Sequence, residues 1–117
     1  MVPTGAGTEV LKRATLHANG NSGNANLLSG SGDHIYTILS IIFNNQTGSA
    51  STIAIRVNDG SNDINLMSDG GSGSTSVGAE GSFVWNDKFV LYEDDILKVF
   101  NSCTNGDWYV SYIDQHF

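Results

Sequence analysis

The sequence predicts an all-β fold, an antiparallel β-sandwich of about eight short strands with a jelly-roll-like arrangement. Composition is the first reason, because fourteen glycines and many Ser, Asn and Thr residues favour turns and strands over helices. Apolar and polar residues also alternate with the period of a strand, and turn-forming clusters separate the alternating segments. The length of 117 residues fits one domain. We expect an extended arm over residues 1–9 and a single sandwich domain over residues 10–117.

The first two predicted strands differ in pattern. Residues 10–18 alternate and form the first strand, and the polar, turn-rich residues 19–26 form a loop. Residues 34–44 are the most apolar stretch, and in a regular strand Tyr36, Ile38 and Ile42 would share one face while other apolar residues occupied the opposite face. A half-solvated antiparallel strand does not need two apolar faces. We therefore expect another layer or another subunit to cover the second face.

Short alternating segments separated by turns make up the rest of the chain. The residues Asn58 to Asp63 predict a hairpin turn, and the Asn105-Gly106 pair is the strongest hairpin signal in the sequence. A low-complexity stretch of Gly and Ser over residues 68–76 predicts a flexible loop. The remaining predicted strands are residues 51–58, 64–67, 82–86, 88–92, 96–102 and 108–113.

Charge and hydropathy argue against two classes of partner. The formal net charge is -7, and the five basic residues are scattered without a run, so no basic patch is available for nucleic acid. The longest apolar run, Ile41 to Phe43, is far too short to span a bilayer. Cys103 is the only cysteine, and the first ten residues lack the features of a secretion signal. These features predict assembly in a reducing cytoplasm.

The sequence offers no constellation for catalysis, metal binding or a cofactor. Three histidines lie far apart without Cys or carboxylate residues at ligand spacing. Asp59 to Asp63 places oxygen ligands at alternating positions but lacks the glutamate that closes a calcium loop, so a hairpin turn explains it more simply. The acidic residues 93–95 fit a solvated strand junction, and no nucleophile elbow is present. We therefore expect a protein that is not an enzyme and holds no cofactor.

Aromatic residues leave one alternative open. Trp85, Trp108 and Tyr109 could stack on sugar rings, as the flat apolar faces of aromatic side chains do in carbohydrate-binding modules. Their positions in alternating strands favour core or interface roles instead.

Several phrases of the sequence carry a resemblance to a known family. They are LKRATLHA, HIYTILSIIFNN, IRVNDGSNDINLM, FVWNDKFVLYEDDILKV and the terminal WYVSYIDQ. Together these phrases cover the chain from about Val10 to its end, and in this order they resemble small virion proteins of marine bacteriophages, including cyanophages. The resemblance implies a non-enzymatic β-sandwich present in many copies, as a capsid decoration or cement protein or as a neck or tail accessory. It also implies a homo-oligomer, for which we favour a trimer.

Candidate contact residues follow from these two lines of reasoning. We expect Tyr36, Ile38 and Ile42 to form the contact between subunits, because symmetric oligomers bury a continuous apolar patch. The arm, including Val2, Pro3 and Glu9, is expected to order on a neighbouring shell subunit. The expected partners are further copies of this chain and other capsid or head-to-tail proteins, in a virion assembled in the cytoplasm of the host bacterium.

Overall fold

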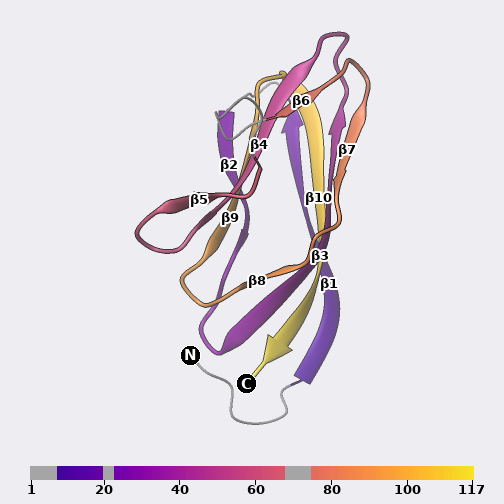
Figure 1. Ribbon diagram of the computed structural model, residues 1–117. Coiled ribbons are helices and arrows are strands. Elements are labelled where there is room, and N and C mark those ends of the chain that lie inside the picture. Colours follow the sequence, from indigo (N-terminus) through magenta and orange to yellow (C-terminus); the bar gives the residue numbers. More distant parts are fainter. Residues whose placement is uncertain (1–7, 20–22, 68–74) are drawn as a thin grey trace.

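The computed structural model describes residues 8–19, 23–67 and 75–117, and these form two antiparallel sheets packed face to face (Figure 1). The predicted antiparallel sandwich is confirmed, with ten strands in the described residues instead of about eight. Sheet A has the order β1 (Thr8–Asn19), β10 (Asn105–His116), β3 (His34–Asn45) and β7 (Ser82–Trp85), and β8 (Phe89–Leu91) also pairs with β3. Sheet B has the order β2 (Gly23–Ser29), β9 (Ile96–Asn101), β4 (Ser51–Asn58) and β5 (Asp63–Asn65), and β6 (Thr75–Val77) also pairs with β4.

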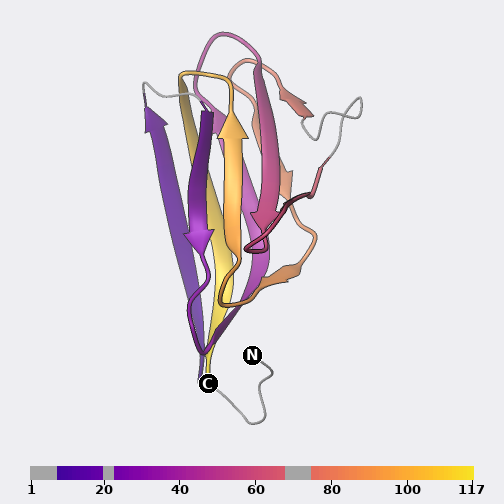
Figure 2. The same cartoon turned by 90° about the vertical axis from the view of Figure 1, so that its left-hand side faces the viewer.

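The chain passes repeatedly from one sheet to the other. The first four strands alternate between sheets A and B, and β9 and β10 again lie in different sheets. The view in Figure 2 shows the long strands of both sheets running along the same axis. Because β1 and β10 are antiparallel neighbours over their full length, Thr8 is opposite His116, and the start of β1 lies beside the end of the chain.

The core lies between the sheets and is filled by the inward-facing residues of both. Alternation is clear in β10, where every second residue from Gly106 to Asp114 is buried. Trp108 is 1% exposed and its ring centroid lies 4.6 Å from that of Phe43. Its indole nitrogen donates a hydrogen bond of 3.2 Å to the Asn101 side chain of sheet B. This bond supplies the polar partner that a buried tryptophan needs and ties the two sheets together.

A β-bulge in β3 explains why that strand is apolar on both sides. Ser111 of β10 is opposite Ser40, whereas Tyr112 is opposite Ile38, so Leu39 is the extra residue. A bulge inserts one residue and reverses the side to which the following residues point. Tyr36 and Ile38 face the core before the bulge, and after it the core side is taken by Ile41 and Phe43, with Ile42 outside.

The bulge overturns one prediction about subunit contacts. Tyr36 is 9% exposed and Ile38 is 0% exposed, and both belong to the central hydrophobic cluster. The expectation that these two side chains contact another subunit is therefore wrong, because they are already covered by sheet B. The second apolar face of this strand is an effect of the change in phase, and only Ile42 of the three points outward.

Two turn predictions have opposite outcomes. The hairpin at residues 58–63 is confirmed: β4 pairs with β5, Asp59 Oδ1 accepts hydrogen bonds from the backbone of Ser61 and Asn62, and Gly60 has a φ of 94°. These backbone hydrogen bonds lower the pKa of Asp59.

The predicted Asn105-Gly106 hairpin is wrong, because both residues begin β10 and the connection from β9 crosses between sheets. A Cβ at Gly106 would lie 2.7 Å from Phe43, so this glycine makes room for a core ring.

Two strands lie where the sequence predicts loops. β2 covers part of the predicted loop over residues 19–26, and β6 extends into the end of the low-complexity stretch. β2 also carries an irregularity between Asn26 and Leu28, where its register with β9 shifts. Polar residues and an interrupted alternation hid β2 from a search for regular strand patterns.

Candidate assembly surface

The two solvent-facing surfaces of the sandwich differ in polarity. Of the eight large apolar side chains that are exposed in the described residues, five lie on the outer face of sheet A. We define the sheet A outer face as the side of β1, β10, β3, β7 and β8 that points away from sheet B. Its exposed apolar residues are Leu11 (71% exposed), Val84 (51%), Val90 (42%), Tyr109 (39%) and Ile42 (38%).

These residues form two rows that cross the whole sheet. The first, which we call the Leu11 row, consists of Leu11, Ile113, Thr37 and Val90, each opposite the next on β1, β10, β3 and β8. The second, which we call the Tyr109 row, consists of Thr15, Tyr109, Ile42 and Val84 on β1, β10, β3 and β7. Side chains directly opposite one another on neighbouring strands contact each other, so each row is a continuous ridge of apolar and β-branched residues.

A row of two serines and one arginine separates the two apolar rows. Ser111 is opposite Ser40 on the neighbouring strand, and their hydroxyl oxygens are 2.9 Å apart in a hydrogen bond. On the other side of Ser111, Arg13 of β1 places its guanidinium 6.0 Å from the centre of the Tyr109 ring, within the range of a cation–π contact. We call Arg13, Ser111 and Ser40 the central row.

Charged groups occur mainly at the two ends of this face. At one end the imidazole of His17 contacts the carboxylate of Asp107, which is opposite it on β10. At the other end Glu9 is opposite Gln115. The face therefore carries two carboxylates and one guanidinium, and most of the negative charge of the chain lies elsewhere.

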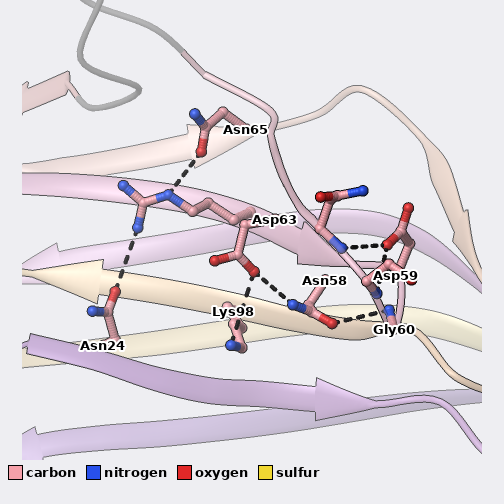
Figure 3. Close-up of polar contacts among 10 residues, drawn as sticks. Asn24, Asn58, Asp59, Gly60, Asp63, Asn65 and Lys98 are labelled. Carbon is pink, nitrogen blue, oxygen red and sulfur yellow. Dashed lines mark hydrogen bonds and ion pairs between the residues drawn. The ribbon is translucent and has the colours of Figure 1, made fainter.

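The outer face of sheet B is polar. Arg56 donates through Nε to Asn65 Oδ1 at 2.7 Å and through Nη1 to Asn24 Oδ1 at 3.4 Å (Figure 3). Asn58 donates to Asp63 at 2.9 Å, and the ammonium of Lys98 lies 3.9 Å from the same carboxylate. Figure 3 shows these contacts crossing β5, β4, β9 and β2 as a ladder of amides and charges. Such a face is well hydrated, so the apolar surface of the sandwich is confined largely to one side.

The three aromatic residues considered for sugar stacking are not brought together. Trp108 is in the core. Trp85 is opposite Ile41 on the core side of sheet A, and its indole nitrogen donates to the backbone oxygen of Asp87 at 2.8 Å. Only Tyr109 stands on an outer face. The three side chains therefore do not form one flat platform.

The predicted arm lies mostly outside the described residues. Val2 and Pro3 are among residues 1–7, which the structure does not describe. Glu9 lies within β1, paired with Gln115, because that strand begins at Thr8. Leu11, Val84 and Val90 lie on this outer face but are not among the contact residues predicted from the sequence. Each belongs to a segment predicted as a strand. Alternation within one strand does not show which strands are its neighbours in the sheet.

A buried carboxylate closes the end of the sandwich where β1 starts. Asp114 is 4% exposed and accepts a hydrogen bond of 2.7 Å from the ammonium of Lys12. Its other oxygen lies 2.7 Å from Nδ1 of His34, whose ring stacks on that of His116 at 4.4 Å. Burial opposes ionisation of Asp114, but the hydrogen bonds and charges of His34 and Lys12 outweigh it and hold the pKa of this carboxyl below its ordinary value.

This cluster has no further ligands that would make it a metal centre. Among residues 8–19, 23–67 and 75–117, no group of three or more His, Cys, Asp or Glu side chains is placed to hold a metal ion. The same residues contain no helix that is long and apolar enough to cross a membrane.

Comparison with known proteins identifies similar folds at low sequence identity. The sequence matches no protein-family model and no curated protein. A chain in the capsid structure of Helicobacter pylori bacteriophage KHP30 superposes with a TM-score of 0.55 and 8% identity, covering 92% of this chain and 91% of that one. A chain of the disulfide-linked pili that form Bacillus endospore appendages gives a TM-score of 0.53 and 14% identity, covering 100% and 96%.

A third similar structure is a virus-like particle of the extra small virus of the prawn Macrobrachium rosenbergii. Its TM-score is 0.49 at 7% identity, covering 97% of this chain and 82% of that one. The two higher-scoring matches establish that this sandwich fold also occurs in a phage capsid and in a pilus. At such low identities the shared property is the fold.

Proposed function

We propose that this protein is a non-enzymatic structural component of a virus particle, present in many copies. The observation that carries the proposal is the contrast between its two outer faces. One is crossed by two apolar rows, and the other carries a hydrated ladder of charges and amides. Large contiguous apolar patches on soluble proteins mark interaction sites. A sandwich with one such face is suited to being a repeated building unit.

The structural comparisons support the same function. The two matches with TM-scores above 0.5 come from a phage capsid and from pili, both of which are assemblies of repeated chains. The strand order also supports a jelly roll, since consecutive long strands alternate between the sheets and each sheet interleaves early and late strands. Jelly rolls are frequent in viral capsid proteins.

The resemblance of the sequence to marine phage virion proteins gives the proposal its finer form. On that basis the chain is a capsid decoration or cement protein, or a neck or tail accessory, that forms a homo-oligomer and stabilises the particle. It is assembled in the host bacterium and contacts other capsid or head-to-tail proteins. The trimer favoured by the resemblance is tested by the solution mass described below. Of the expected subunit-contact residues, Ile42 is retained.

Quantifying the chain in purified particles tests this function directly. Particles of the virus that encodes the chain are separated on a density gradient, and the chain is measured by mass spectrometry relative to the major shell protein. We expect it to co-sediment with intact particles at tens of copies or more per particle, and we expect particles lacking it to release their genome at lower temperature. A chain found only in the soluble fraction of infected cells would refute the structural role.

A further inference from the structure

We propose that the sheet A outer face binds the same face of a second copy of this chain, which gives a dimer with twofold symmetry. This inference deepens the proposed function, because it names the partner of the same surface. Three properties of the described residues support it: the order of the rows, the size of the face and its charge.

The order of the rows makes the face complementary to itself. The Leu11 row and the Tyr109 row lie on either side of the central row, at similar distances along the strands, because Leu11 and Thr15 are each two residues from Arg13. Consider a twofold axis that lies in the plane of contact and runs along the central row. It places the Leu11 row of each copy on the Tyr109 row of the other. The small residues Ser40 and Ser111 then meet their own copies, which allows the sheets to approach closely there. Arg13 also meets its own copy, on the edge strand β1, with its guanidinium turned over the Tyr109 ring. Self-complementarity of this kind is what a twofold contact requires.

The face has the size of a stable interface. β1, β3 and β10 each contain 12 residues. With a rise of about 3.4 Å per residue and about 4.8 Å between strands, these three strands and the shorter β7 and β8 beside β3 cover about 700 Å². Standard protein–protein interfaces bury about 800 Å² on each partner. A second copy can therefore cover both apolar rows at once.

Charge also favours a second copy over a strongly charged partner. Two copies with a net charge of -7 repel each other. They can associate where charge is nearly balanced, and the sheet A outer face has only Glu9 and Asp107 against Arg13. His17 contacts the carboxylate of Asp107, and the guanidinium of Arg13 lies over Tyr109, so these groups are partnered within one copy. A basic partner would gain little from this face.

Light scattering coupled to size exclusion, at several concentrations, tests the proposal. We expect the full chain to pass from monomer to dimer as concentration rises, which replaces the trimer expected from the sequence. The variant Leu11→Glu/Val84→Glu changes one exposed residue in each row and should weaken the dimer at least tenfold. Ile64→Glu is the matched control, because Ile64 is an apolar residue of sheet B with 46% exposure. It should leave the dimer unchanged.

A charge-complementation experiment distinguishes face-to-face contact from other modes. The twofold axis along the central row places Val84 of one copy against Val90 of the other. The variants Val84→Glu/Val90→Glu and Val84→Lys/Val90→Lys should each be monomeric, because like charges meet, and mixing them should restore a mass of two chains. Circular dichroism checks that both variants remain folded.

Four results would overturn the proposal. They are a monomer at all concentrations, a trimer, a dimer insensitive to the row variants, or a dimer lost when residues 2–7 are deleted, since that would place the N-terminal segment in the contact. A dimer that is absent from particles would refute the proposed function and leave this inference standing. A monomer found on particles would do the reverse.

Discussion

Ile38 and Ile42 provide a matched pair of substitutions that tests the bulge in β3. They are the same residue type, four positions apart in one strand, and in a regular strand they would share a face. The bulge places Ile38 in the core with 0% exposure and Ile42 on the sheet A outer face with 38% exposure. Replacing each by alanine should therefore have very different effects on the free energy of unfolding.

The expected magnitudes follow from burial. Ile38→Ala removes three carbons from a fully packed site and should cost about 2–5 kcal/mol, a loss that includes the cavity left behind. Ile42→Ala loses only part of its cross-strand contact and some strand propensity, and should cost about 1 kcal/mol or less. With roughly 3–5 °C lost per kcal/mol in a domain of this size, the Tm should fall by at least about 6 °C for Ile38→Ala.

Urea unfolding followed by tryptophan fluorescence measures both losses, since Trp108 is buried in the core. The measurement belongs at a concentration where wild type and variants are monomeric, because dimerisation through Ile42 would add a concentration-dependent contribution to stability. Equal losses for the two variants would refute the change of phase at Leu39 and restore a regular strand. A larger loss for Ile42→Ala would refute the assignment of Ile38 to the core.

Three further substitutions, one of them with a matched control, test other parts of the fold by urea unfolding. Gly30→Ala should destabilise by about 1–3 kcal/mol, because its Cβ would lie 2.0 Å from the backbone oxygen of Tyr92, whereas Gly48→Ala, with nothing within 4 Å, should be nearly neutral. Asp114→Asn should cost about 1–3 kcal/mol at pH 7. The pKa of Asp114 is lower in the folded than in the unfolded protein. Its contribution to stability is therefore complete above the unfolded pKa of about 3.9 and is lost as the pH falls through the folded pKa. Wild type and variant should converge in stability in acid, and parallel pH profiles would contradict this. Asn45→Asp should destabilise the fold strongly. The fully buried Asn45 amide donates hydrogen bonds to the backbone oxygens of two loops, and a carboxylate cannot donate them. An unchanged urea midpoint would contradict that role.

The sequence predicts the sandwich well where alternation is regular. The strand over residues 51–58 is observed with the predicted bounds, and the alternating residues 10–18 lie within β1. The prediction fails where a residue's role depends on its neighbours in space. Asn105-Gly106 has the composition of a turn, yet Gly106 is required by the ring of Phe43, a residue more than sixty positions away.

The candidate surface was partly hidden for the same reason. The sequence predicts Ile42 as a contact residue because its strand is apolar on both sides, and in the structure Ile42 points outward because of the bulge. Leu11, Val84 and Val90 looked like ordinary strand residues. Their significance arises only when the strand order places them in rows with Ile113, Tyr109 and Ile42, and that order depends on non-local pairing that no single segment encodes.

The bulge in β3 links stability to assembly within one strand. Without it, the residues after position 39 would reverse direction, placing Ile41 and Phe43 outside and Ile42 inside. Trp108 would then lose the ring of Phe43, and Ile41 would take the place of Ile42 in the Tyr109 row. The same extra residue therefore completes the core and sets which side chains the sheet A outer face presents. A substitution that removed the bulge should impair folding and self-association together, whereas substitutions in the rows alone should affect only self-association.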